Sequence, residues 1–321
     1  MLRFITCRVL AMIPSLLIVS IVVFSLLHLV PGDPAQQYFG VNAKPEALEA
    51  MRKELGLDRP VHEQYLTWLW GLLHGDLGMS LIHRTPITEM FASRLPVTIE
   101  LVALSMVVAI VLGVGAGVIS GTRQYSRVDF TISMLGLTGI SLPNFWLGTM
   151  LALVFSVKLG WLPFGGYVPF SEDPIGNIKS MIMPSLSLGL VSASIIMRMT
   201  RSALMDVSRR DYIRTARAKG APEGMVVRRH MLKNALIPVT TVAGMEAGYM
   251  FGGAFLVEAV FYLPGVPTYA LAAVLQRDYP VLQAATLLIA VAFMTINLGV
   301  DVLNAYIDPR QRESIARMAT A

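Results

Sequence analysis

The sequence predicts an all-α polytopic membrane protein with six transmembrane helices and a structured segment outside the membrane. Its composition is the first reason, since 55% of the 321 residues are hydrophobic and 15% are charged, whereas soluble domains have about 45–50% apolar and about 25% charged residues. The second reason is a set of long runs nearly without charge, and the third is an uneven distribution of lysine and arginine. This balance excludes a soluble enzyme and a disordered chain. A single cysteine, Cys7, excludes an internal disulfide framework.

Six apolar runs are long enough to cross a bilayer. Each has 22 or more residues, and a helix that rises about 1.5 Å per residue then reaches about 30 Å. A helix satisfies its own backbone polar groups in lipid, and the sequence lacks the alternating pattern of a membrane β-barrel. Gly113 and Gly117, in the second run, form a pair of small residues that lets another helix approach closely. The six runs cover residues 9–30, 97–119, 130–157, 181–204, 237–262 and 281–306.

These runs divide the chain into four parts. Residues 1–30 contain a cytoplasmic N-terminus and the first transmembrane helix, and residues 31–96 form an extracytoplasmic segment. Residues 97–306 form the transmembrane core, which includes a cytoplasmic loop at residues 205–236, and residues 307–321 form a cytoplasmic tail.

The orientation follows from the positions of the basic residues, because lysine and arginine gather in cytoplasmic loops. The loop after the second run holds Arg123 and Arg127, and the loop between the fifth and sixth runs holds a single base, Arg277. Both termini are therefore expected in the cytoplasm. The part of the chain from the end of the fourth run to the fifth run is the most basic, with Arg198, Arg201, Arg209, Arg210, Arg214, Arg217, Lys219, Arg228, Arg229 and Lys233.

This basic segment has several explanations. Nucleic acid or anionic lipid could bind it, or it could simply record the cytoplasmic side, and the interspersed acids Asp206, Asp211 and Glu223 weaken a phosphate-binding role. Residues 211–220 favour a short helix with an acid at its start and Gly220 as its stop. A partner that grips such a helix would move both flanking spans. The sequence has no phosphate-binding loop of the form Gly-x4-Gly-Lys-Ser/Thr, so energy for active transport would come from another subunit.

The run Asp-Tyr-Ile-Arg-Thr-Ala-Arg-Ala-Lys-Gly at residues 211–220, followed by Lys-Asn-Ala-Leu-Ile-Pro at residues 233–238, resembles the cytoplasmic signature loop of ABC importer permeases. The peptide/nickel subfamily is the most similar, in particular the first permease of dipeptide, oligopeptide and glutathione importers. Further agreement includes Leu-Pro-Gly at residues 263–265 and Asp-Pro-Arg at residues 308–310. The general signature begins with Glu-Ala-Ala where this chain has Arg214, Thr215 and Ala216, so no contact of that glutamate is carried over.

The resemblance implies a type I ABC importer permease fold and a transporter subunit rather than an enzyme, in a bacterial inner membrane. The cargo would be short peptides delivered by a solute-binding protein, and transport would follow ATPase-driven alternating access. Implied partners are a homologous second permease, two ABC ATPase subunits that hold the ATP and magnesium, the extracytoplasmic binding protein and membrane lipid, with no nucleic acid. The ATPase-coupling helix would comprise Asp211, Tyr212, Arg214, Thr215, Ala216, Arg217, Ala218, Lys219 and Gly220.

Two other functions remain open at this point. One is a nickel-chelate ABC importer permease, which shares the subfamily pattern. The other is a secondary transporter driven by protons through Glu246 and Glu258, although the sequence shows no evident inverted repeat. A membrane enzyme would need a catalytic constellation that the sequence does not present. The five histidines show no metal-ligand spacing, and neither a metal nor a cofactor is expected in this chain.

The outer segment is long for a loop, so it is expected to contain helices near residues 44–55 and 61–74. The aromatic residues of the second helix could lie in the headgroup belt or face an external partner. The predicted contacts with the binding protein are Asp33, Tyr65, Trp68 and Asp76.

Polar groups inside the spans are candidates for function. The predicted translocation pathway comprises Ser141, Asn144, Glu246 and Gly248, against the alternatives of a packing kink or an interhelical hydrogen bond. Glu258 is expected to have a structural role, holding the turn at Pro264 and Gly265. A further prediction joins Arg198 and Arg201 to Asp301 as a structural or gating ion pair between two spans.

Overall fold

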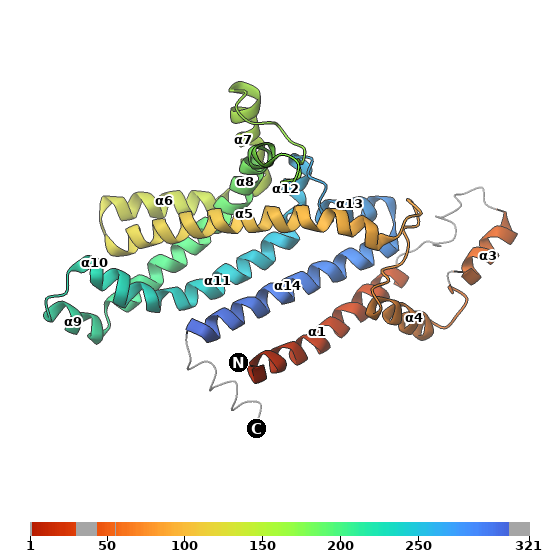
Figure 1. Ribbon diagram of the computed structural model, residues 1–321, viewed down its shortest axis with the longest axis horizontal. Coiled ribbons are helices and arrows are strands. Elements are labelled where there is room, and N and C mark those ends of the chain that lie inside the picture. The colour runs from red at the N-terminus through yellow and green to blue at the C-terminus, as the bar shows by residue number, and fades with distance from the viewer. Residues whose placement is uncertain (1, 30–43, 55, 308–321) are drawn as a thin grey trace.

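A computed structural model of the chain describes residues 2–29, 44–54 and 56–307. The described residues form helices, with one isolated bridge between Met79 and Pro86. The long helices run side by side in an elongated bundle (Figure 1). They are α1 (Leu2–Leu29), α5 (Ile87–Thr122), α8 (Pro174–Ser208), α11 (Leu232–Gly253) and α14 (Tyr279–Ile307). The shorter helices are α3 (Pro45–Glu54), α4 (Val61–Leu73), α6 (Arg127–Ser141), α7 (Asn144–Leu151), η1 (Ala152–Lys158), α9 (Asp211–Ala218), α10 (Glu223–Met225), η2 (Val226–Met231), α12 (Phe255–Val260) and α13 (Val266–Gln276).

Four of the described helices are long and apolar enough to span a membrane, and a bent pair would make a fifth. The four spans are Phe4–Ser25, Ile87–Thr122, Pro174–Ser208 and Tyr279–Tyr306. The chain is thus a helical multi-pass membrane protein. Helix α11 has 22 residues but does not reach the same hydropathy, because it contains Glu246, two threonines and several glycines.

The span predicted at residues 130–157 is not one straight helix, because the chain bends by 102° between Arg127–Ser141 and Asn144–Lys158. Pro143 is the cause. A proline disfavours helical backbone in the residue before it, and Leu142 has extended backbone angles, φ −88° and ψ 128°. The predicted span at residues 237–262 also stops early: α11 ends at Gly253, and α12 follows as a separate short helix.

Helices α5 and α8 pack closely because small residues recur on α5 at every turn. A Cβ atom added to Gly113 would lie 2.7 Å from the carbonyl oxygen of Ala193, and one added to Gly117 would lie 2.8 Å from that of Met197. A Cβ atom on Gly121 would touch Leu204. The predicted close approach at Gly113 and Gly117 is confirmed, and the partner is a helix of the same chain.

A buried carboxyl group, that of Glu258, binds α5 near its N-terminal end. Glu258 of α12 is fully buried. Its Oε1 accepts a hydrogen bond from Thr98 Oγ1 of α5 (2.8 Å), and its Oε2 accepts bonds from the backbone nitrogen (3.0 Å) and Oγ1 (2.8 Å) of Thr268. Thr98 Oγ1 in turn accepts from Val266 N at 3.0 Å. A Cβ atom on Gly265 would collide with the Glu258 carboxyl group, so the predicted structural role at this turn is confirmed.

The outer segment rests on α1. The Tyr65 and Trp68 rings of α4 lie 5.4 Å and 5.5 Å from the ring of Phe24, measured between centroids. Tyr65 also shares a 2.8 Å hydrogen bond with Ser20. The opposite face of α4 exposes Leu66 and other apolar side chains. Helices α3 and α4 lie close to the two positions predicted from sequence.

The α5–α8 contact gives a matched pair of substitutions. Gly117→Val should lower the thermal unfolding midpoint of the purified protein, because overpacking a close helix contact costs about 1–3 kcal/mol. Gly115→Val places the same side chain in the same helix where no atom lies within 4 Å of the added Cβ. A Gly115→Val midpoint as low as that of Gly117→Val would contradict the tight seam.

Candidate functional site

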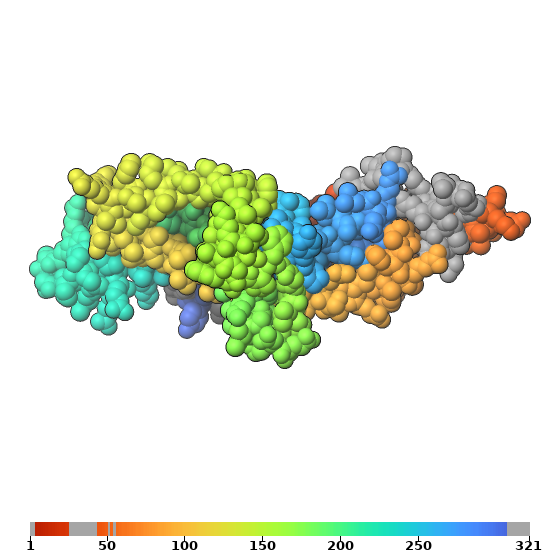
Figure 2. All heavy atoms as spheres, turned by 90° about the horizontal axis from the view of Figure 1, so that it is seen from above, coloured from red at the N-terminus to blue at the C-terminus, as the bar shows by residue number. Residues whose placement is uncertain are grey.

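The segment between α8 and α11 forms one end of the bundle. Helix α9 starts at Asp211, three residues after α8 ends at Ser208, and α10 and η2 lead into α11. In Figure 1 this segment lies at the opposite end of the molecule from α13. Figure 2 shows the same separation on the molecular surface, with the segment in teal and α13 in blue. A helix is therefore present at Asp211–Ala218, within the range predicted, and it lies in the connection between two long helices.

Glycine ends α9 as the sequence predicted. Gly220 has φ +77°, a left-handed conformation that residues with a Cβ atom rarely adopt. Its backbone nitrogen donates to the carbonyl oxygen of Arg217 at 2.9 Å, and that of Ala221 donates to Ala216 at 3.3 Å. These bonds use carbonyl groups of the last helical turn, and the chain then turns back toward α10.

One apolar side chain fastens α9 to the bundle. Ile213 is fully buried, and it belongs to the same core cluster as Val226 and Met231 of η2. Sequence reasoning missed Ile213, although it stands between polar residues in the DYIRTARA run of α9. Ala216 is half-buried against the same core. The exposed candidates are Asp211, Tyr212, Arg214, Thr215, Arg217, Ala218, Lys219 and Gly220.

Polar contacts fix the turn after α9. The Arg217 guanidinium donates to both carboxyl oxygens of Glu223, from Nη2 to Oε1 at 2.6 Å and from Nε to Oε2 at 3.1 Å. This pair raises the pKa of Arg217 and lowers the pKa of Glu223, in each case mainly through the hydrogen bonds. Asn234 Nδ2 donates to the Tyr212 hydroxyl at 3.2 Å, which ties α9 to α11. Arg217 therefore has its partner within the segment, and Tyr212 has its partner on α11.

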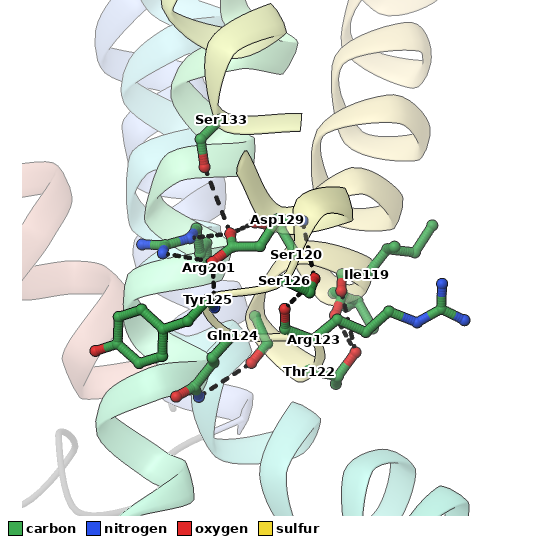
Figure 3. A network of polar contacts seen from close by, with 12 residues as sticks. Ile119, Ser120, Thr122, Arg123, Gln124, Tyr125, Ser126, Asp129, Ser133 and Arg201 are labelled. Carbon is green, nitrogen blue, oxygen red and sulfur yellow. Dashed lines mark hydrogen bonds and ion pairs between the residues drawn. The ribbon is translucent and has the colours of Figure 1, made fainter. Parts of the chain in front are cut away.

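The predicted ion pair of Arg201 with Asp301 is wrong. Arg201 instead binds Asp129 of α6, with Nε 2.7 Å from Oδ1 and Nη2 2.9 Å from Oδ2 (Figure 3). Asp301 of α14 pairs with Arg8 of α1 at 3.2 Å, and Arg198 is exposed on α8. The helices that carry Arg201 and Asp301 are not neighbours at this depth, since α6 packs on α8 and α1 packs on α14.

The predicted pathway residues fall in different places. Glu246 of α11 is half-buried, and its Oε2 accepts a 2.6 Å hydrogen bond from Ser192 Oγ of α8. Gly248 is buried against α14, where an added Cβ atom would collide with the Phe293 ring. Ser141 Oγ donates to the Leu137 carbonyl oxygen at 2.9 Å, and Asn144 Oδ1 accepts from the next backbone nitrogen at 2.8 Å. These two residues flank the break between α6 and α7.

The predicted contacts with an external partner are also divided. Tyr65 and Trp68 are half-buried against Phe24 of α1. Asp76 is exposed, and its Oδ1 accepts a hydrogen bond from Gly78 N at 2.8 Å. Asp33 lies outside the described residues.

A buried aspartate that sequence reasoning missed connects the outer segment to the bundle. Asp278, between α13 and α14, accepts hydrogen bonds from Ser80 Oγ (2.5 Å) and from the backbone nitrogens of Leu81 (3.2 Å) and Ile82 (3.4 Å). Only the unusual run Arg-Asp-Tyr-Pro at residues 277–280 could have drawn attention to it.

The chain matches two family models. Residues 113–313 match the inner membrane component of binding-protein-dependent transport systems, and residues 1–102 match the N-terminal part of the membrane component of such systems. Together the two models cover most of the helices described above, including α9 and its neighbours.

Curated relatives align over almost the whole chain. A dipeptide transport system permease of Alkalihalophilus pseudofirmus is 43% identical over 332 residues, which cover 97% of this chain and 99% of that protein. A putative peptide transport system permease of Brucella abortus is 43% identical and covers 95% and 97% of the two chains. A glutathione transport system permease of Escherichia coli (strain K12) is 42% identical and covers 97% and 99%.

A solved structure shows the same fold. The MetNI methionine ABC transporter in an inward-facing conformation contains a chain that aligns with a TM-score of 0.58, over 68% of this chain and 96% of that one. Only 18% of the residues are identical, so the likeness concerns the fold alone.

The buried anchor of α9 gives the next prediction. Ile213→Ala should speed hydrogen exchange throughout Asp211–Ala218, because losing a buried isoleucine costs about 2–5 kcal/mol and nothing else apolar replaces it. Arg214→Ala is the matched control, since its side chain is 75% exposed and its pair with Asp211 is long, at 3.7 Å. Equal exchange rates in the two variants would show that Ile213 does not hold α9.

Proposed function

The chain belongs to the inner membrane component family of binding-protein-dependent transport systems, and we propose that it is one permease subunit of an ATP-driven importer of short peptides. It is a multi-pass inner membrane protein and a transporter subunit rather than an enzyme. The proposal assigns it the translocation pathway, in company with a homologous second permease, two ATPase subunits and an extracytoplasmic solute-binding protein.

The observation that supports this function is that α9 buries one face against the bundle and exposes the other. Ile213 holds one face of the helix against η2, while Asp211, Arg214 and Lys219 stand exposed on the rest. Force applied to that exposed face would reach α8 on one side and α11 on the other. The sequence has no phosphate-binding loop, so ATP and magnesium belong to the partner subunits that dock here. Arg217 contributes by fixing the turn through Glu223, because two of its three guanidinium nitrogens already donate to that carboxyl.

The same arrangement supports six spans and two cytoplasmic termini. Helix α11 runs alongside α14 in the bundle (Figure 1), and its exposed stripe contains Thr241, Met245 and Tyr249. A mixed polar and apolar stripe suits a face turned toward a second permease or toward cargo rather than lipid, which accounts for its lower hydropathy. The start of α1 and the end of α14 both point toward the end of the bundle that carries α9 (Figure 1).

The names of the relatives indicate the class of cargo. Their names specify dipeptide, peptide and glutathione transport, and all three cargoes carry amino and carboxylate groups. Glu246 is the carboxyl placed to meet a substrate amine, since it borders the exposed stripe of α11 and is held by Ser192. Ser141 and Asn144, at the break between α6 and α7, are the other candidate residues that line the pathway.

The alternative of a proton-driven transporter needs Glu246 and Glu258 to exchange protons. Hydroxyl groups of neighbouring helices already donate hydrogen bonds to both carboxyl groups.

Transport then proceeds by alternating access. Closure of the ATPases would push α9, and the attached long helices would change from an inward-open to an outward-open packing. The exposed outer segment, including Asp76, is the side at which the binding protein delivers peptide.

Alanine substitutions at two glycines that both have left-handed backbone angles test this mechanism. Gly220 (φ +77°) and Gly160 (φ +64°, just after η1) both have no atom within 4 Å of an added Cβ. Alanine at either position should cost about 1–2 kcal/mol through its left-handed backbone. We expect only Gly220→Ala to slow ATP-dependent uptake of a labelled dipeptide by the reconstituted complex, because only Gly220 shapes the segment that the ATPase grips.

Two results would contradict the proposed function. One is peptide uptake by the wild-type complex at full rate after its ATPase subunits are inactivated. The other is equal loss of uptake in Gly160→Ala and Gly220→Ala, which would leave stability alone as the explanation.

A further inference from the structure

The first turn of α6 is held to α8 by a network around the buried Asp129, which comprises Asp129, Arg201, Ser120, Tyr125 and Ser133 (Figure 3). Asp129 is 3% exposed. Besides the two bonds from Arg201, its carboxyl accepts from Ser120 Oγ, from Tyr125 N at 2.9 Å and from Ser133 Oγ at 3.4 Å. The carboxyl group therefore has donors from the end of α5, the turn before α6, α6 itself and helix α8.

Such a network strongly resists separation of its parts. A buried carboxylate without its cation would keep its charge in a poorly solvated place, which is why breaking one side of a buried pair is much more unfavourable than the pair is favourable. The two-point geometry of a guanidinium on a carboxylate also fixes orientation. Tyr125 has a left-handed backbone, φ +60°, and its nitrogen binds Asp129, so the turn itself depends on the carboxylate.

The position of the network connects it to α9. Arg201 lies in the last turns of α8, which ends at Ser208, and α9 begins at Asp211. Elsewhere α6 meets α8 through small contacts, such as Gly136 beside Met197 and Gly139 beside Ser194. Among the described residues, Arg201 and Asp129 form the only ion pair between these two helices, and it lies at the end of α8 nearest α9.

We propose that Asp129 and Arg201 are positioning residues for transport: they make α6 move together with α8 when α9 is displaced. This inference rests on the proposed function, because it assigns the pair to the path between the ATPase contact and the transmembrane helices. Without the pair, α9 would still bind the ATPase and α8 would still move, but α6 and the break at Pro143 would lag behind. ATP would then be hydrolysed without a matching amount of transport.

The first test is Asp129→Asn in the complete reconstituted complex. Asparagine keeps the size of the side chain and one acceptor oxygen but removes the charge that holds Nε and Nη2 of Arg201. We expect the number of labelled dipeptides imported per ATP hydrolysed to fall by about fivefold or more, the lower end of typical coupling effects, while hydrolysis continues. Arg123→Gln is the matched control, because it removes a charge from the same turn and its side chain points away from Asp129 (Figure 3).

The outcomes separate coupling from stability. If Asp129→Asn lowers complex yield and thermal stability but leaves dipeptides imported per ATP at the wild-type value, the pair is structural only and the inference is overturned. If the wild-type complex imports no peptide at all, the proposed function fails instead, which is a different result from the same assay.

The second test does not depend on the stability of an Asp129 variant. A Cβ atom on Gly139 of α6 would lie 3.3 Å from Ser194 Cβ of α8, close to the separation of about 3.5–4.5 Å in a disulfide. In a Cys7→Ser background, Gly139→Cys with Ser194→Cys would staple the two helices. If they move as one body, oxidised and reduced protein should import dipeptide at the same rate. Uptake blocked by oxidation and restored by reduction would show that α6 and α8 move apart during the cycle, and would overturn the inference.

Discussion

The close packing of α5 on α8 is the constraint on which the rest of the structure depends. Gly113, Gly117 and Gly121 let the backbones of α5 and α8 contact each other over several turns. We therefore expect the two helices to move as one rigid body. Polar groups close it at both ends. Glu258 joins α5 to α12 and α13 at one end, and Asp129 joins the end of α5, the start of α6 and α8 at the other.

This arrangement explains how a helix of eight residues could control a much larger bundle. Helix α9 follows α8 with almost no intervening chain, and Ile213 seats it on η2, which continues into α11. The two long helices that meet at α9 also bind each other through Ser192 and Glu246. Displacement of α9 therefore acts on a connected framework, and discrete repacking of that framework is what alternating access requires.

Sequence reasoning found the features that depend on local pattern. The signature run predicted α9 and its glycine stop, the small-residue spacing predicted close contact at Gly113 and Gly117, and Glu258 before the Pro-Gly turn predicted a structural carboxyl.

The sequence-based predictions failed where the answer depends on which helices are neighbours in space. Arg201 has two possible acidic partners, Asp129 and Asp301, and only the packing of α6 on α8 decides between them. Tyr65 and Trp68 could face either side of α4 until the position of α1 was known. The break at Pro143 was visible as a kink, but its 102° angle depends on packing of α7 against α8 and α12.

The most direct test of the central claim is a pair of distances across the nucleotide cycle. Spin labels at exposed positions Ala218 of α9 and Val128 of α6, in a Cys7→Ser background, report whether the framework moves as one body. A second pair, Ala218 with Leu17 of α1, reports that the transition took place. The account predicts an unchanged Ala218–Val128 distance between the nucleotide-free and ATP-trapped complex while the second distance shifts. A shift in the Ala218–Val128 distance as large as that of the second pair would contradict it.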